Sequence, residues 1–298
     1  MDLAELRRIY ARQMLALANA STNVNLEDAY AAVPRQAFLG DGEWRINTPW
    51  SSYTLIPNDP ALIYQDVVVA LDRERGVNNG SPSLHARWLN VVAPRRGETV
   101  AHIGAGAGYY SAILSELVGS NGHVAAIEFD AALAARARTN LADRPNVEFV
   151  EGNGFDWPQA PADVVYVNFA ASRPATAWIE NLAIGGRLIF PLGVPRTGTY
   201  VGGYHVLNAI TLVVTRFADG YAAEALGRVS FVYAENAKPA VPQEEINVLR
   251  DCLDRKPLDE IKSLVWRKPQ NPPLCWFAGA DWALTSETEG RQVTASVG

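Results

Sequence analysis

Cysteine is scarce in this sequence, because only Cys252 and Cys275 occur among 298 residues. They stand far apart and outside any C-x-x-C spacing, so neither a disulfide framework nor a cysteine zinc site is predicted, and no metal is expected. The segment from Met1 to Ala20 carries charged residues within its apolar pattern, unlike the apolar region of a secretory signal. These features predict a protein of a reducing compartment, the cytoplasm.

Long hydrophobic runs and basic clusters are lacking as well. No stretch reaches the roughly 18 uncharged apolar residues that a membrane-spanning helix requires. The formal net charge is -6, and the 26 Lys and Arg residues are scattered along the chain. Because nucleic-acid binding usually requires a basic patch, neither nucleic acid nor a membrane is expected as a partner. The 48% hydrophobic content is typical of a globular protein with a sizeable core.

The N-terminal part of the chain predicts helices followed by irregular structure. Apolar residues at helical spacing predict an amphipathic helix over residues 2–20 and a short helix over 26–33. The stretch over 34–57 is rich in aromatic residues, glycine, proline and serine, which predicts an irregular and partly buried segment. We therefore expect residues 1–75 to form a helical and irregular cap.

Residues 76–235 show an alternation of strands and helices. The expected strands lie over 99–103, 123–128, 147–150, 163–167 and 187–191, and the expected helices over 84–92, 109–118, 131–142 and 175–182. This alternation predicts an α/β, Rossmann-like, doubly wound fold with a mostly parallel sheet. Two further strands flank Ala218-Asp219-Gly220, a turn that predicts a C-terminal antiparallel hairpin.

The last part of the chain, residues 236–298, has a different character. It is rich in proline, contains one expected helix over 244–253, and carries three of the eight tryptophans. No motif within it points to a chemistry. We treat it as a C-terminal extension without an assigned role.

Three glycines at alternate positions form the strongest local motif. Gly104, Gly106 and Gly108 stand between an expected strand and the helix that begins at Tyr109. Such glycines let a ligand approach the backbone closely, and the helix start offers unpaired N–H groups. A dinucleotide fingerprint would have its third glycine at position 109, so the spacing favours S-adenosylmethionine over a nicotinamide cofactor. The alternative is that the glycines only form tight turns.

Two further positions fit a nucleoside site. Glu128 ends the next expected strand, 24 residues after Gly104, where its carboxylate can accept hydrogen bonds from both ribose hydroxyls. Asn153 and Gly154 follow the third strand at the carboxyl edge of the sheet, where ligands bind in open α/β folds. We expect Asn153 to bind the adenine amino group.

From about residue 25 to 232 the order of motifs resembles the protein-L-isoaspartate O-methyltransferase family. The segments that carry the resemblance are Ala32–Phe38 (AVPRQAF, against AVPRxxF), Tyr64–Asp66 (against Y-x-D), Ser81–Ala86 (SPSLHA), Trp178–Gly193 with its GGRLIFPLG strand, and the closing Asp219-Gly220 turn. The resemblance implies a class I methyltransferase. Its cofactor would be S-adenosylmethionine, and its product S-adenosylhomocysteine.

Three departures from the family pattern fall within the expected site. The serine of the family's T-I-S-x-P loop falls on Gly80, with Ser81 beside it. His102 stands where the family usually has an acidic residue before the first glycine. Asn153 replaces the aspartate of a G-D-G motif, and its amide oxygen can still accept a hydrogen bond from adenine.

The resemblance also implies the acceptor and the site residues. The acceptor would be a carboxylate in a peptide or protein, of the isoaspartyl kind, and an ionised carboxylate needs no general base. The expected donors to it are Ser81, Asn79 and His85. The expected cofactor contacts are His102, Gly104, Ala105, Gly106, Gly108, Tyr109, Glu128, Phe129, Asn153 and Gly154.

Several alternatives stay open at this point. Residues 78–80 are also typical of a plain turn, and His85 and Tyr109 are equally compatible with structural packing. The protein as a whole is also compatible with a methyltransferase for another carboxylate or a small molecule, or with a non-catalytic protein that keeps the fold. A nicotinamide-dependent dehydrogenase is a remote further alternative, and no pattern indicates an oligomeric state.

Overall fold

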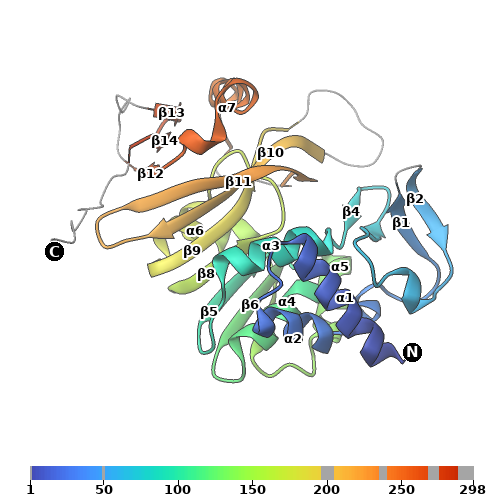
Figure 1. The fold of residues 1–298 in the computed structure, drawn as a ribbon. Coiled ribbons are helices and arrows are strands. Elements are labelled where there is room, and N and C mark those ends of the chain that lie inside the picture. Colours follow the sequence, from blue (N-terminus) through green and yellow to red (C-terminus); the bar gives the residue numbers. More distant parts are fainter. Residues whose placement is uncertain (1, 49–50, 196–204, 235–239, 268–274, 288–298) are drawn as a thin grey trace.

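One ten-stranded mixed sheet forms the centre of the computed structural model, which describes residues 2–48, 51–195, 205–234, 240–267 and 275–287 (Figure 1). The strand order is β13-β14-β12-β11-β10-β9-β8-β5-β6-β7. The parallel strands are β5 (Thr99–Ile103), β6 (His123–Glu128), β7 (Val147–Glu151), β8 (Ala162–Val167) and β9 (Leu182–Leu192). The expected parallel α/β core is therefore confirmed, and β9 begins five residues earlier than the expected strand at 187.

Alternate residues of the parallel strands face opposite sides of the sheet and enter two separate cores. Val100, Val124 and Val164 belong to one core cluster, and Ala101, Ala125 and Val165 belong to the other. Side chains alternate in this way because successive residues of a strand point to opposite faces. Burial on both faces explains why these strands are continuous apolar runs in the sequence.

Helices cover both faces, as expected for a doubly wound fold. The first core cluster packs against α1 (Leu3–Leu17), α2 (Val24–Ala32), α3 (Pro82–Val92) and α4 (Tyr109–Val118). The second packs against α6 (Thr176–Glu180) and α7 (Gln243–Arg255). Helix α5 (Ala131–Asn140) lies beside β6 and β7. None of the helices in the described ranges has the length and apolar composition needed to cross a bilayer.

The antiparallel half of the sheet continues from β9. It contains β10 (His205–Arg216), β11 (Tyr221–Val232), β12 (Ser263–Trp266), β14 (Trp282–Thr285) and β13 (Cys275–Ala278). The expected hairpin at 218–220 is confirmed, since β10 and β11 pair antiparallel on either side of it. The helix expected over 244–253 is confirmed as α7.

The C-terminal extension adds strands to the sheet. Strand β12 pairs with both β11 and β14, which places the extension at the antiparallel edge. Trp276 and Trp282 are each 1% exposed and lie in the same core cluster as Trp178 of the parallel half. The predicted boundary at 235/236 lies outside the described residues.

The expectation of irregular structure over 34–57 is wrong. Strands β1 (Trp44–Thr48) and β2 (Ser51–Ile56) pair antiparallel, with Trp44 opposite Ile56 and Ile46 opposite Thr54. Trp44 and Ile46 are buried, whereas the intervening Arg45 is not. This alternation is the usual pattern of a half-buried strand, but the many glycines and prolines around it obscured the pattern. A second small hairpin, β3 (Ala70–Asp72) with β4 (Val77–Asn78), follows.

Candidate cofactor and acceptor site

The glycine turn after β5 adopts a backbone that disfavours side chains. Gly104, Gly106 and Gly108 have φ angles of +75°, +57° and +96°. Glycine adopts this left-handed region without a steric penalty, which explains the alternate glycines. The backbone N–H groups of Gly104 and Ala105 both donate to the carbonyl of Ile127 on β6, so the turn is tied to the neighbouring strand.

The three glycines differ in the space around them. A Cβ on Gly104 would lie 2.9 Å from Phe169, and one on Gly108 would lie 2.9 Å from Leu141. At Gly106 the nearest atom is Leu71 Cδ1, at 3.7 Å, which is ordinary van der Waals contact. Gly106 is therefore the place where a ligand can reach the turn's backbone most closely.

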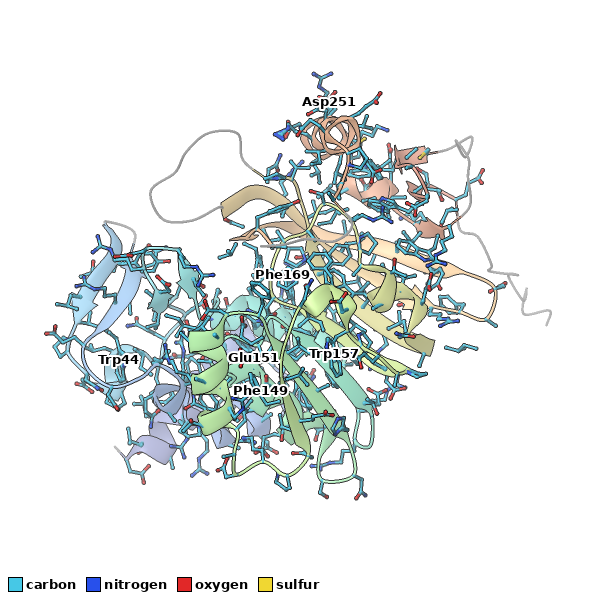
Figure 2. All side chains as sticks on the ribbon, turned by 180° about the vertical axis from the view of Figure 1, so that it is seen from behind. Trp44, Phe149, Glu151, Trp157, Phe169 and Asp251 are labelled. Atoms are coloured by element: carbon cyan, nitrogen blue, oxygen red, sulfur yellow. The ribbon has the colours of Figure 1, made fainter. Side chains whose placement is uncertain are left out.

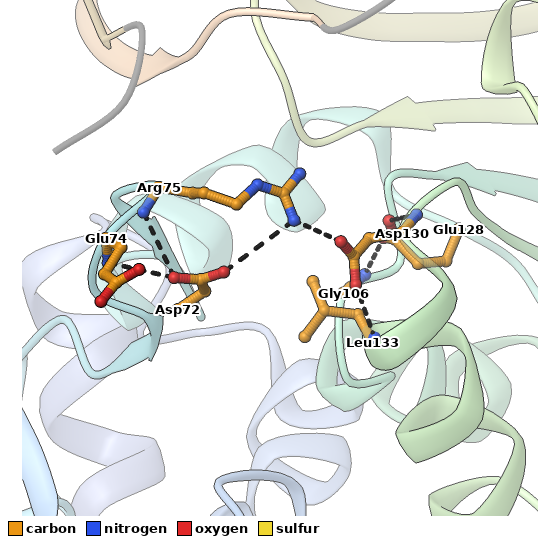
Figure 3. Close-up of polar contacts among 7 residues, drawn as sticks. All are labelled: Asp72, Glu74, Arg75, Gly106, Glu128, Asp130 and Leu133. Carbon is orange, nitrogen blue, oxygen red and sulfur yellow. Dashed lines mark hydrogen bonds and ion pairs between the residues drawn. The ribbon is translucent and has the colours of Figure 1, made fainter.

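Glu128 closes the site opposite the glycine turn (Figure 3). Its side chain is almost buried, and Oε2 accepts a hydrogen bond from the Gly106 N–H at 2.7 Å. The second oxygen, Oε1, accepts from the N–H of Asp130 at 2.9 Å. Burial raises the pKa of Glu128, and these N–H groups partly offset the effect. Each carboxylate oxygen keeps a lone pair that can accept a ribose hydroxyl.

The β3–β4 hairpin lies over the same region, which the sequence did not predict (Figure 3). Arg75, which lies in the turn between β3 and β4, forms an ion pair with Asp130. Asp130 is also the N-cap of α5, where Oδ1 accepts the Leu133 N–H at 2.8 Å. Because Leu71 of the hairpin lies next to Gly106, the hairpin forms one wall of the predicted nucleoside site.

His102 is fully buried at the carboxyl end of β5. Its Nδ1 is 2.7 Å from Ser111 Oγ on α4, and its Nε2 is 2.8 Å from Nδ2 of Asn168, which follows β8. Burial lowers the pKa of His102 to about 3, so the ring is neutral near pH 7. Asn168 was not among the expected site residues, although it directly follows β8 at the same edge of the sheet where Glu128 ends β6.

Asn153 and Gly154 form a tight turn after β7. Asn153 caps the short 3-10 helix η3 (Gly154–Asp156), and its Oδ1 accepts the Phe155 N–H at 3.1 Å. A Cβ on Gly154 would lie 2.2 Å from Ile103 Cγ2, so no side chain fits there. Phe169, which Figure 2 labels above Glu151 at the end of β7, packs against Phe155. These contacts place the turn beside the end of β5.

Tyr109 and Phe129 have different surroundings. Tyr109 is 3% exposed, its hydroxyl lies 3.4 Å from that of Tyr10 on α1, and its ring packs on Phe38. Its side chain therefore packs against the N-terminal cap. Phe129 is 47% exposed and follows Glu128 directly, so its ring is free to contact a ligand.

The predicted acceptor loop, residues 79–81 before α3, is held by a buried arginine and by a carboxylate. Arg35 is fully buried, and its Nη2 donates to Asn79 Oδ1 at 3.3 Å. The same Oδ1 accepts the Val69 N–H at 2.9 Å, while Asn79 Nδ2 is buried without a partner in the described part of the chain. Ser81 caps α3, and its hydroxyl donates to Asp66 Oδ1 at 3.0 Å.

His85 lies beneath the acceptor loop. The ring is 1% exposed, its Nδ1 is 2.7 Å from Tyr166 Oη, and it stacks on Tyr110 at 3.7 Å. Burial, with smaller contributions from His102 and Arg35, lowers its pKa well below the usual range. Gly80 lies directly above, because a Cβ there would be 2.4 Å from His85 Nε2.

The two halves of the predicted site meet at the start of α4. Tyr110, which stacks on His85, is the second residue of the helix that follows the glycine turn. The acceptor loop therefore lies beside the cofactor turn. No group of three or more His, Cys, Asp or Glu side chains within the described ranges is arranged to hold a metal ion.

Comparisons with known proteins agree on one family. The family model of protein-L-isoaspartate(D-aspartate) O-methyltransferase matches residues 19–201, more than half of the chain. A protein-L-isoaspartate O-methyltransferase of Aeropyrum pernix is 33% identical over 193 residues, which cover 63% of this chain and 67% of the relative. Protein-L-isoaspartate O-methyltransferase 2 of Anaeromyxobacter sp. is 31% identical over 233 residues, which cover 76% and 82%.

Solved structures show the same fold. A protein-L-isoaspartate O-methyltransferase aligns with a TM-score of 0.63 at 21% identity, over 80% of this chain and 70% of that one. A protein of that name from Plasmodium falciparum, in complex with S-adenosyl-L-homocysteine, aligns with a TM-score of 0.55 at 17% identity, over 76% of this chain and 99% of that one.

Proposed function

This chain belongs to the protein-L-isoaspartate(D-aspartate) O-methyltransferase family, and from that membership we propose that it methylates isoaspartyl carboxylates in peptides or proteins. The methyl donor is S-adenosylmethionine. A carboxylate oxygen of the acceptor forms a bond to the methyl carbon, while the carbon–sulfur bond breaks and its electron pair stays on sulfur. The products are a methyl ester and S-adenosylhomocysteine.

The observation that carries the proposal is the glycine turn joined to Glu128. Gly106 leaves space beside its Cα, and Glu128, which accepts the Gly106 N–H, lies at the end of β6 with acceptor capacity to spare. This space and these acceptors fit the nucleoside part of S-adenosylmethionine. We assign the adenine to Asn153 and Gly154, and further cofactor contacts to the backbone of Gly104, Ala105 and Gly108 and to the exposed ring of Phe129. Of the other expected contacts, the His102 ring nitrogens are engaged by Ser111 and Asn168, and the buried Tyr109 side chain packs against the N-terminal cap.

The acceptor carboxylate is assigned to the loop of residues 79–81 before α3 and to His85 on α3. Asn79 offers an Nδ2 without a partner in the described ranges, and His85 offers its Nε2. The one hydroxyl proton of Ser81 is donated to Asp66, so Ser81 serves the acceptor only when its hydroxyl turns away from that carboxylate. No proton has to leave the acceptor, so these residues act by positioning the carboxylate and excluding water. The neutral state of His85 suits a donor and makes it a poor acid near pH 7.

The direct test uses matched peptides that contain an isoaspartyl or an ordinary aspartyl residue. With S-adenosylmethionine present, mass spectrometry should show a methyl gain on the isoaspartyl peptide and formation of S-adenosylhomocysteine. Methylation of neither peptide, with S-adenosylhomocysteine still raising the melting temperature, would favour another acceptor. Failure of that ligand to raise the melting temperature at saturating concentration would remove the cofactor role, since a ligand of the native state must stabilise it.

A substitution at Glu128 tests the cofactor half separately. Glu128→Ala should weaken S-adenosylhomocysteine binding by at least roughly 10- to 100-fold, because a single hydrogen bond to a charged group contributes about 1.5–3 kcal/mol. Isothermal titration calorimetry measures the change. Glu148→Ala is the matched control, since Glu148 is an exposed acid on the adjacent strand β7. Equal weakening by both variants would contradict the assignment.

The proposal also assigns a role to each part of the chain. We assign the cofactor to residues 76–235, with residues 1–75 as a cap and residues 236–298 as a C-terminal extension. Two free thiols, Cys252 and Cys275, support assignment to the cytoplasm. A net charge of -6 supports a peptide or protein acceptor over a nucleic acid.

A further inference from the structure

His102 and Asn168 form a neutral pair at the carboxyl ends of two adjacent parallel strands. The contact joins His102 Nε2 to Asn168 Nδ2 at 2.8 Å. An amide Nδ2 can only donate, so it donates to an unprotonated Nε2. The proton of the ring then lies on Nδ1, which donates to Ser111 Oγ at 2.7 Å. In this orientation of the Asn168 amide both ring nitrogens of His102 are engaged.

This arrangement leaves one acceptor unused. Oδ1 of Asn168 is buried and has no hydrogen-bond partner among the residues that the structure describes. Buried polar atoms in proteins are nearly always paired, so such an atom indicates a place for a ligand donor. Asn168 also lies beside the glycine turn, because its Cβ is 3.7 Å from the position of a Cβ on Gly104.

The charge of the pair suits a cationic ligand group. Burial keeps His102 neutral by lowering its pKa to about 3. A charged imidazolium would repel the ammonium and sulfonium groups of S-adenosylmethionine, whereas a neutral ring does not. An amide oxygen can accept a hydrogen bond from an ammonium, and such charge-assisted bonds are stronger than neutral ones.

We propose that Asn168 Oδ1, held in place by His102, binds the ammonium group of S-adenosylmethionine. The inference rests on the proposed function. Asn168 contacts the cofactor, and His102 acts through Asn168 as a positioning residue. The pair thereby supplies a neutral acceptor at the position where the family usually has an acidic residue before the first glycine.

Three ligands test the proposal with Asn168→Ala in isothermal titration calorimetry. They are S-adenosylhomocysteine, its analogue without the amino group, and 5′-methylthioadenosine, which lacks the whole amino-acid part. The dissociation constant of S-adenosylhomocysteine should rise roughly 10- to 100-fold, because a hydrogen bond to a charged group is lost. The other two constants should stay within about twofold of those of the unsubstituted protein.

Two further variants separate binding from structure. Asn168→Asp keeps an acceptor, and with the proton of the His102 ring moved to Nε2 it should retain the affinity for S-adenosylhomocysteine. His102→Leu should reduce the preference for S-adenosylhomocysteine over the deaminated analogue, because Asn168 loses the group that orients its amide. This preference is a ratio of two affinities, so a general loss of folding would not change it.

Each contrary outcome overturns a defined claim. Equal weakening of all three ligands by Asn168→Ala would show a purely structural role, and an unchanged affinity for S-adenosylhomocysteine would show no role in binding. Equal weakening of S-adenosylhomocysteine and its deaminated analogue alone would place Asn168 on the carboxylate and overturn the ammonium assignment. If S-adenosylhomocysteine fails to bind the unsubstituted protein, the proposed function itself fails.

Discussion

Gly80→Ser is expected to lower the free energy of unfolding by about 2–5 kcal/mol, although serine is the family's residue at this position. Gly80 has a φ of +75°, which a serine adopts only with strain. The added Cβ would also lie 2.4 Å from His85 Nε2 and 2.8 Å from Cδ2 of the same ring. The His85 ring is stacked on Tyr110 and hydrogen-bonded to Tyr166, so it cannot move aside without breaking buried contacts.

Urea denaturation of Gly80→Ser beside Gly97→Ser separates the two causes. Gly97 has a φ of +86° with nothing within 4 Å of an added Cβ, so its substitution reports backbone strain alone. Gly80→Ser should be the more destabilising of the two. The double variant Gly80→Ser/His85→Ala should lose less than the sum of its parts, because the overlap is gone. Equal effects at the two glycines would show that the overlap with His85 is relieved without cost.

The same contacts show why glycine suits position 80 in this chain. With a backbone φ of +75° at this position, His85 occupies the space that a side chain would need, so Gly80 and His85 fit together as a pair. In this chain the donors to the acceptor carboxylate are proposed to come from Asn79 and His85, and from Ser81 once its hydroxyl turns away from Asp66.

The parallel half of the fold was predictable because its signals are local. Strands such as β5 and β8 are short, mainly apolar runs that are followed directly by glycine or asparagine, and each is buried on both faces. The short strands β12, β13 and β14 have four residues each, and β12 depends on pairing with the distant β11. Pairing between distant segments leaves little periodicity for sequence reasoning to detect.

The same distinction between local and distant signals applies to the residues of the site. Glu128 and the three glycines were predicted because a strand–turn–helix unit fixes their spacing along the chain. Asn168 stands 66 residues from His102, with which it pairs, and Arg75 stands 55 residues from Asp130. Their roles follow from the tertiary arrangement. The strand order places β8 beside β5, and the Arg75–Asp130 ion pair joins the turn of the separate β3–β4 hairpin to the N-cap of α5. A sequence without the topology does not reveal such pairs.

Acidification should destabilise the protein strongly because two buried histidines must remain neutral in the fold. Burial lowers the pKa of His102 to about 3 and that of His85 well below its usual value near 6.5. Below about pH 6.5 the unfolded chain binds protons on both rings while the folded chain does not. The free energy of unfolding therefore decreases as the pH is lowered. Above that pH both states are neutral and the contribution is constant.

The expected loss is about 1.4 kcal/mol per pH unit for each histidine, or on the order of 4 kcal/mol for both between pH 6.5 and 5. Glu128 acts in the opposite direction, because burial raises its pKa, but it offsets one histidine at most. Urea denaturation at pH 7.5, 6.5, 5.5 and 5.0 measures the slope. His102→Gln cannot titrate at this position and should reduce the slope by about half.

His123→Gln provides the matched control, because the His123 side chain is 46% exposed on β6 and already solvated in the folded protein. It should reduce the slope less than His102→Gln does. If His102→Gln and His123→Gln give the same slope as the unsubstituted protein, then His102 takes up a proton in the folded state. A charged ring could no longer accept the Asn168 amide at Nε2, so the same result would weaken the assignment of Asn168 to the cofactor's ammonium group. The pH dependence of stability therefore tests, without any ligand, the neutral state on which that assignment depends.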